Sequence, residues 1–186
     1  MSIAFRKIYT YRAATTDVFA AEAGALSFFV ISGSPDVTRF INRVRVSGLS
    51  LTTLAAITVV CEKWSTTAFS GGTTTTLTRV PLNSAFPAAD ADGLVQVYTA
   101  APSEGTLVGT IGARTVMAKS TTVVDGAEFS DVEFIFGEED NSEVVLNGVL
   151  ESLGLAFAAA PASAVNCSVE VEWMERVWIR TTTYKS

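Results

Sequence analysis

The stretch CSVEVEWMERVWIR, residues 167–180, decides the fold class of this chain. Alternate residues in it are apolar and share one face of an extended strand, namely Val169, Val171, Trp173, Val177 and Ile179. Charged residues take the other face, namely Glu170, Glu172, Arg176 and Arg180. A period of two predicts a long, half-buried β-strand. Glu175 and Trp178 interrupt the alternation, which indicates a bulge or a change of environment near the middle of the strand.

Nine further segments have strand composition and are bounded by Gly, Pro, Asn, Asp and Ser turns. They are Ile3–Arg12, Ala25–Ser32, Thr38–Ser47, Ala55–Trp64, Gly93–Thr99, Thr106–Ala118, Ala127–Phe136, Glu143–Leu146 and Leu150–Ala158. Only FAAEAGA, residues 19–25, is predicted to form a helical turn. Many short strands without a long helix predict an all-β protein, an antiparallel β-sandwich. Because residues 65–92 form a long connection, we expect jelly-roll connectivity.

Length and composition predict a single domain spanning residues 1–186. Hydrophobic residues make up 48% of the chain and charged residues only 17%, so the core is large and uncharged side chains cover much of the surface. A long Thr-rich loop is expected at about residues 65–92, and a polar C-terminal tail at about residues 181–186. Such a surface is typical of a protein that is partly buried in an assembly.

Charge is distributed unevenly along the chain, whose net charge is −6. Residues 1–50 carry six basic and three acidic residues, whereas the remainder carries seven basic and sixteen acidic residues. Residues 125–143 hold eight carboxylates and no Lys or Arg. This asymmetry favours head-to-tail contact with copies of the chain or with a charged partner. The alternative is a solvated surface on which charges cluster by chance.

The residues of common catalytic sites are missing from the sequence. The chain has no histidine, which excludes Ser-His-Asp and Cys-His arrangements and the usual zinc sites. Cys61 lies in an alternating apolar run and is predicted to be a buried core residue, and no Cys-x-x-Cys motif is present. The segment SGGTTTT, residues 70–76, lacks the lysine of a phosphate-binding loop. We expect neither an enzyme nor a bound cofactor.

The segment GEEDNSE, residues 137–143, is the densest acidic cluster. Its members Glu138, Glu139 and Asp140 offer the hard oxygen ligands that Ca²⁺ prefers, but their spacing does not match an EF-hand. An exposed hairpin turn explains the cluster without an ion, and we favour that interpretation. Asp90 and Asp92 are interpreted in the same way, so no metal site is expected.

Arg43 and Arg45 alternate with valines and share one face of a predicted strand. A basic pair of this kind can contact phosphate, but the chain is acidic and nucleic-acid affinity requires several such contacts. A salt-bridged or partner-facing strand is therefore predicted, with no nucleic acid bound. No segment is apolar enough to cross a membrane, and the N-terminus lacks the apolar core of a signal peptide. We expect a protein that stays in a reducing cytoplasm or is released by lysis.

Several segments together resemble a group of small β-rich proteins encoded in the structural-gene regions of tailed bacteriophages. They are DVF (17–19), FINRVRVSG (40–48), EKWSTTAFSGGTTTTLTRVPLNS (62–84), VQVYTAAPSEGTLVGTIGA (95–113) and VEVEWMER (169–176). Their order matches the group over most of the chain. Two departures are Asn83, where the group usually has Asp, and the EKW that precedes the Thr-rich segment.

The resemblance implies a non-enzymatic virion protein that is assembled in the cytoplasm of the bacterial host. A decoration or cement protein bound to the major capsid protein is the preferred role, and a homo-oligomer, most favourably a trimer, is expected. A neck, tail or baseplate component is the first alternative. A host-surface carbohydrate-binding module is the second, with Trp64, Tyr98 and Trp178 as candidate exposed aromatics. The candidate contact residues are Arg43, Arg45, Thr73, Thr74, Thr75, Thr76 and Arg79.

Overall fold

The computed structural model describes residues 4–21, 27–65, 69–121, 131–137 and 143–180. Within these ranges the chain contains strands and no helix, which confirms the all-β prediction. The strands are β1 (Ala4–Ala14), β2 (Phe19–Ala21), β3 (Ser27–Ser32), β4 (Thr38–Leu51), β5 (Ala55–Ser65), β6 (Thr74–Thr76), β7 (Arg79–Pro81), β8 (Val95–Tyr98), β9 (Thr106–Ser120), β10 (Val132–Ile135), β11 (Val144–Leu146), β12 (Ser152–Phe157) and β13 (Val165–Arg180).

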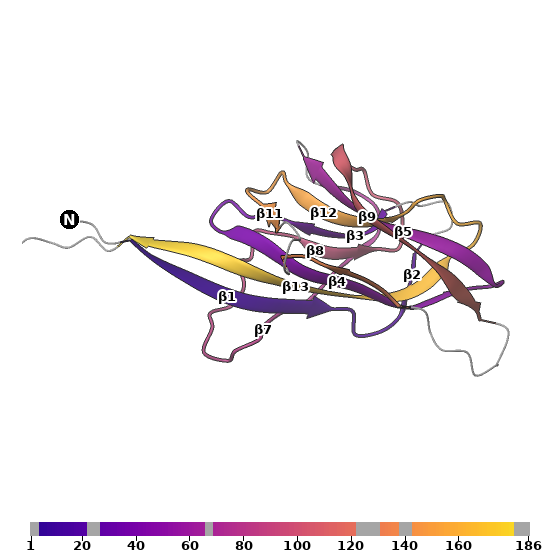
Figure 1. Ribbon diagram of the computed structural model, residues 1–186, viewed down its shortest axis with the longest axis horizontal. Helices are drawn as coiled ribbons and strands as arrows, with labels where there is room; N and C mark the ends of the chain where they lie inside the picture. Colours follow the sequence, from indigo (N-terminus) through magenta and orange to yellow (C-terminus); the bar gives the residue numbers. More distant parts are fainter. Residues whose placement is uncertain (1–3, 22–26, 66–68, 122–130, 138–142, 181–186) are drawn as a thin grey trace, which may run out of the picture.

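The strands form one curled mixed sheet, drawn in Figure 1. Its order is β6-β8-β3-β12-β5-β9-β4-β13-β1-β7, while β10 and β11 also pair with β4 and β2 pairs with β13. All pairings are antiparallel except the short one between β4 and β9 at residues 50–51 and 119–120. The prediction of a purely antiparallel sheet was therefore wrong at this junction. The pairing of β4 with β9 joins two halves of the sheet. One half contains β1, β2, β4, β7, β10, β11 and β13, and the other contains β3, β5, β6, β8, β9 and β12.

The long connection between β5 and β8 links the two ends of the strand order. It contains β6, which pairs with β8, and β7, which pairs with β1. Only Leu77 and Thr78 separate β6 from β7, so the sheet curls until its first and last strands approach each other. The connection that the sequence predicted as one loop thus contains two short edge strands, which only two residues separate.

One apolar core lies inside the curl and takes side chains from both halves of the sheet. Val44 and Val46 of β4, together with Val171 of β13, meet Ile31 of β3 and Leu155 of β12. All five side chains are fully buried. The predicted burial of Val171 and Trp173 is confirmed, because β13 alternates buried and half-buried residues from Val165 to Arg176.

Two local predictions need correction. Residues 19–21 of the predicted helical turn form β2, which pairs with residues 165–167 of β13, and the rest of that segment lies outside the described residues. Glu175 does not interrupt the buried face of β13, because it is itself buried on that face. The predicted bulge is present two residues earlier, where the register with β4 shifts between Glu172 and Trp173.

Strands β1 and β13 form a long ribbon that extends beyond the rest of the sheet in Figure 1. They pair continuously from Ala4 opposite Arg180 to Ala14 opposite Glu170. The two ends of the described chain therefore lie together at the tip of this ribbon. The predicted tail at residues 181–186 lies outside the described residues.

Candidate functional site

A buried ion pair joins the two long central strands. Arg39 of β4 lies opposite Glu175 of β13, and the side chains are 0% and 2% exposed. Nε and Nη2 of Arg39 lie 3.2 and 3.1 Å from Oε1 of Glu175, and Nε1 of Trp173 donates a hydrogen bond to the same oxygen at 3.0 Å. Buried charges are tolerated only when they are paired and hydrogen-bonded. Both conditions are met here.

The same ion pair fastens the segment that precedes β8. Nη1 of Arg39 donates to the carbonyl oxygen of Ser32 at 2.8 Å, and Nη2 donates to that of Asp90 at 3.0 Å. The amide of Asp90 donates in turn to Oε2 of Glu175 at 3.1 Å. Backbone groups of Ser32 and Asp90 thus satisfy the remaining hydrogen-bonding capacity of the pair, and they hold this segment against β3, β4 and β13.

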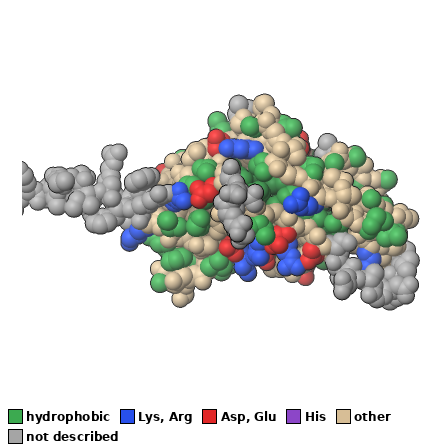
Figure 2. Space-filling view, in the orientation of Figure 1, with side chains coloured by type: hydrophobic (Ala, Val, Ile, Leu, Met, Phe, Trp, Pro, Cys, Tyr) green, Lys and Arg blue, Asp and Glu red, His purple; other side chains and the backbone are tan. Residues whose placement is uncertain are grey.

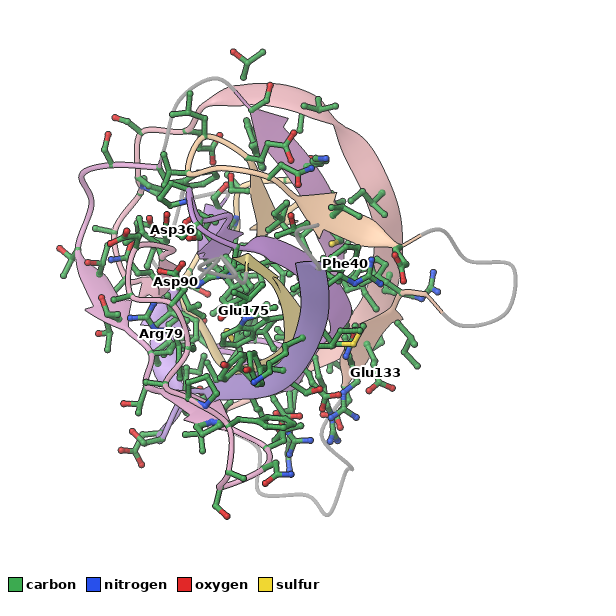
Figure 3. The ribbon with its side chains drawn as sticks, turned by 90° about the vertical axis from the view of Figure 1, so that its left-hand side faces the viewer. Asp36, Phe40, Arg79, Asp90, Glu133 and Glu175 are labelled. Carbon is green, nitrogen blue, oxygen red and sulfur yellow. The ribbon has the colours of Figure 1, made fainter. Side chains whose placement is uncertain are left out.

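Arg79 joins the network from β7. Its Nη1 donates to the carbonyl oxygens of Asp90 and Gly93, at 2.6 and 2.8 Å. Figure 3 shows Arg79, Asp90 and Glu175 close together, with Asp36 beside them. A Cβ atom on Gly93 would lie 2.0 Å from Nη1 of Arg39, so only glycine fits at this position. We call Arg39, Arg79, Asp90 and Glu175 the buried network.

The network also changes proton affinities. Burial alone would raise the pKa of Asp90, but hydrogen bonds from the Ser34 hydroxyl and the Asp92 amide, with the charges of Arg39 and Arg79, hold the pKa of this carboxyl below its usual value. Burial and the charge of Glu175 raise the pKa of the Tyr11 phenol to about 12. Asp90 is therefore an ionised structural group, and its carboxylate is occupied within the chain.

The Thr-rich segment lies on a free edge of the sheet. Thr74, Thr75 and Thr76 form β6, and all three are exposed. One side of β6 pairs with β8, and among the described residues no strand pairs with its other side. From Ser70 to Thr78 the chain has no charged residue. The hydroxyl of Thr76 accepts a hydrogen bond from Nε2 of Gln96, and the carbonyl oxygen of Thr73 accepts one from the Thr99 amide. The exposed side chains of β6 have no ionised neighbour in the segment from Ser70 to Thr78.

Both ends of the Thr-rich segment are anchored. Phe69 is 5% exposed and packs edge-on against Trp64, with ring centroids 5.6 Å apart. Together with Val30 and Tyr98 they form a small apolar cluster, separate from the main core. At the other end Leu77 is buried in the main core. The exposed threonines are thus held between two fixed points.

The turn at Gly71 and Gly72 explains how the chain reaches the edge. Both residues have positive φ, of 70° and 68°, which glycine adopts without strain. A Cβ atom on Gly72 would also lie 2.6 Å from the carbonyl oxygen of Ala100. The chain bends at this point.

A ladder of ion pairs crosses the outer face of β1, β13, β4 and β10. Nη2 of Arg12 lies 3.0 Å from Glu172, and Arg43 lies 2.8 Å from Glu170 and 3.4 Å from Glu133. Arg45 pairs with Asp131. Acidic and basic side chains are also intermixed on the face shown in Figure 2. The basic N-terminal strands are therefore paired with carboxylates from later in the same chain.

The structure does not bring the seven candidate contact residues onto one surface. Thr73–Thr76 lie at the β6 edge, Arg79 enters the buried network, and Arg43 and Arg45 belong to the ion-pair ladder on β4. Sequence reasoning missed Arg39 and Glu175. In the sequence, each of them is a charged residue in phase with the apolar residues of its strand. A charged residue on a buried face needs an oppositely charged partner, and this pattern could have identified the pair.

The other candidate groups occupy ordinary structural positions. Trp64 and Tyr98 are 7% and 2% exposed, so neither offers the exposed aromatic face that a sugar site uses. Burial raises the pKa of both Cys61 and Cys167 to about 12, so neither is a thiolate at neutral pH.

The acidic segment at residues 137–143 is described only in part. Glu138–Asp140 lie outside the described residues, and within the described ranges no three Asp, Glu, Cys or His side chains cluster as metal ligands. The described part of the chain also contains no helix that is long and apolar enough to span a membrane.

No protein-family model matches this chain, and no curated protein matches it.

Proposed function

We propose that the chain is a non-enzymatic structural protein of a tailed-phage virion, most favourably a decoration protein that binds outside the major capsid shell. The observation that carries the proposal is the anchored, uncharged edge strand β6 with its flanking residues 70–78. The resemblance of the sequence to phage structural proteins supports the same conclusion. A decoration protein functions through its contact surface and not through catalysis, because each copy that binds the assembled shell stabilises it by mass action.

The chemistry of the edge suits contact with another protein. Docking a charged surface leaves ions without water unless each one finds a partner, and that desolvation is costly. Thr75 and Thr76 avoid this cost, since their hydroxyls exchange water for carbonyl groups of the partner. The unpaired side of β6 also presents backbone donors and acceptors to which an extended segment of the capsid protein can add as a further strand.

Anchoring increases the affinity of such a contact. A flexible loop loses conformational freedom on binding, and that loss weakens association. Here Phe69 and Leu77 fix the two ends of the segment, and pairing with β8 fixes its middle. β-Branched threonines also lose little side-chain freedom when ordered. The edge is thus organised before the capsid binds.

We also propose that the curled sheet is a jelly-roll sandwich in which the β6–β7 connection closes the side opposite the β4–β9 junction. A jelly-roll needs long connections that cross between its two layers. In support of this proposal, β6 and β7 follow one another in the chain but lie at opposite ends of the strand order. This arrangement places the β6 edge at a margin of the molecule, where a shell contact is accessible.

The test is a binding assay on phage particles stripped of this protein. Thr75→Lys with Thr76→Lys places two ammonium groups on the edge, and we expect occupancy of the particle to fall several-fold while circular dichroism stays unchanged. A matched variant carries Thr53→Lys with Ala159→Lys, at exposed positions outside the strands, and should bind as the wild type does. Equal occupancy of the two variants would contradict a role for β6.

The copy number in the intact particle distinguishes the locations within the virion. A number comparable with that of the major capsid protein is expected for a decoration protein. A number matching a single ring would instead indicate a neck, tail or baseplate component. Quantitative gel densitometry of purified virions, calibrated with known amounts of this protein, gives the answer.

A further inference from the structure

A groove separates β6 from the segment that joins β1 to β2. It has a volume of about 290 Å³ and is lined by residues 14–19 and 75–78, together with Val97 of β8. Thr75 lies opposite Val97 in the β6–β8 pairing, and opposite residues of an antiparallel pair direct their side chains to the same face. Val97 belongs to the main core, so the groove lies along the inner face of the β6 edge.

The groove has apolar walls. Leu77 and Val97 are 5% and 2% exposed, and both belong to the main core. From the other side Val18 is 57% exposed, and its neighbour Phe19 packs partly buried against the core. An aliphatic side chain that enters the groove therefore covers Val18 and loses its own contact with water, which favours association.

Asp17 gives the groove its charge. Among the described residues that line the groove, Asp17 alone is ionised, and it is exposed. No described residue forms an ion pair or a hydrogen bond with its carboxylate. An unpaired carboxylate on a contact surface attracts a Lys or Arg of the partner and disfavours an Asp or Glu.

The open side of β6 determines the shape of the occupant. A strand edge presents backbone donors and acceptors in a row, and an extended segment satisfies them when it pairs as a further strand. Side chains of such a segment alternate between its two faces. The residue opposite Thr75 therefore enters the groove, and residues two positions away along the segment lie on the same face.

We infer that the capsid segment that adds to β6 places an aliphatic side chain in this groove and, two residues away, a Lys or Arg that pairs with Asp17. The inference rests on the proposed contact between β6 and the capsid shell, and it adds the chemistry by which the partner segment is recognised. Backbone pairing provides affinity for any extended segment, whereas the groove and its carboxylate select among them.

Charge reversal at Asp17 tests the inference on phage particles stripped of this protein. We expect Asp17→Lys to lower occupancy of the particle several-fold, because two cations then meet at the groove, and Asp17→Asn to lower it less. Asp36→Lys is the matched control, since it makes the same change of charge at another exposed bend, which does not line the groove. The control should bind as the wild type does, and circular dichroism should be unchanged for all three variants.

These variants separate failure of the inference from failure of the proposed function. If the Thr75→Lys and Thr76→Lys double variant loses occupancy while Asp17→Lys binds like its control, the β6 contact stands and the inference is overturned. If neither loses occupancy, both are overturned. Added salt should also weaken binding of the wild type more than that of Asp17→Asn, because salt screens the ion pair. Equal salt dependence contradicts the pairing.

Photo-cross-linking identifies the partner segment itself. The photoreactive residue p-benzoylphenylalanine replaces Val18 at the groove, and mass spectrometry determines which segment of the particle it attaches to. We expect a capsid segment with a Lys or Arg two residues from an aliphatic residue. The control carries the same label in place of Leu54, which is 66% exposed and does not line the groove. A yield no greater than that of the control, a segment without this pattern, or a second copy of this chain overturns the inference.

Reciprocal exchange of the two charges is the final measurement. The Lys or Arg of the identified capsid segment is changed to Asp, and particles that carry this change should bind Asp17→Lys better than they bind the wild type. Equal binding, or a preference for the wild type, shows that the basic residue does not pair with Asp17 and overturns the inference.

Discussion

Single residues in this protein carry charges where the surrounding side chains are apolar. Arg39 and Glu175 lie on the buried faces of β4 and β13, in strands whose other inward residues are mostly hydrophobic. Such pairs are not strong net stabilisers, since desolvation offsets much of their attraction. Their effect here is to specify position, because the donors of Arg39 fix Ser32 and Asp90 in one arrangement.

Removing one member of the pair should be far more damaging than removing a surface charge. Glu175→Gln leaves Arg39 buried without a counter-ion, and we expect a loss of about 3–5 kcal/mol in the free energy of unfolding. Glu133→Gln, whose partner Arg43 is partly exposed, should cost at most about 1 kcal/mol. Urea titrations of the two variants measure the difference. Similar midpoints would show that the buried pair is not stabilised as described.

The acid stability of the protein should depend on Asp90. Because its folded pKa lies below the ordinary value of 3.8, this carboxylate contributes stability that is fully present at neutral pH. The contribution is lost as the pH falls through that value toward the lower folded pKa. Thermal melts between pH 7 and pH 2.5 should therefore show a shallower acid decline for Asp90→Asn than for the wild type. Parallel curves would contradict the assignment.

At the scale of the secondary-structure elements, β13 organises the sheet. Its inward face carries the apolar residues Val169, Val171 and Trp173. Its outward face carries Glu170 and Glu172, two carboxylates of the ion-pair ladder. Trp173 also stacks on Tyr11 of β1, with ring centroids 5.8 Å apart. One strand thus connects the core, the buried network and the outer ladder.

Trp173→Ala should cost roughly 3–5 kcal/mol, because it opens a cavity in the core and removes the hydrogen bond to Glu175. Trp173→Phe keeps most of the volume and loses the hydrogen bond, so its cost should be intermediate. Met174→Ala, on the opposite face of the same strand, serves as the control. In chemical denaturation the loss of stability should be largest for Trp173→Ala, intermediate for Trp173→Phe and smallest for Met174→Ala. A Trp173→Ala variant as stable as Met174→Ala would exclude the described packing.

The sequence was sufficient to locate the long strands, because alternating side chains appear wherever a strand is half-buried. Each of the ten predicted segments contains a strand in its described part, and residues 25–26 and 127–130 of two of them lie outside the described residues. The strands β2, β6 and β7 were missed because none of them carries a run of large apolar residues like the Val-Val-Leu that marked the equally short β11. The candidate site was located only in part. The sequence marked Thr73–Thr76 as unusual, but it gave no indication that Arg79 turns inward to Asp90.

At the scale of the whole molecule, the order of the strands determines what the chain presents. β6 and β7 lie at opposite ends of that order although they are neighbours in sequence, and β4 and β9 meet although β5 to β8 separate them. Pairing partners so distant along the chain leave no local pattern, so the sheet order was not predictable. Distant pairing also offsets the uneven distribution of charge along the sequence. Arg12 and Arg43, near the start of the chain, form ion pairs with Glu172 and Glu170, near its end.

A core shared by both halves of the sheet should unfold as one unit. We expect the urea transitions followed by tryptophan fluorescence and by far-ultraviolet circular dichroism to coincide, as in a two-state domain. Trp64 and Trp173 belong to separate apolar clusters, so fluorescence samples both regions. Two resolved transitions would mean that the halves joined at β4 and β9 unfold separately.

The place of β13 has a consequence for synthesis. β13 follows β1 and β4 in the chain and lies between them, so both strands must wait until residues 165–180 leave the ribosome before they gain this neighbour. Until then the nascent chain holds β1 and β4 with open edges, a condition in which unfinished β-proteins aggregate. Fragments that stop before Val165 should therefore depend on chaperones and be degraded.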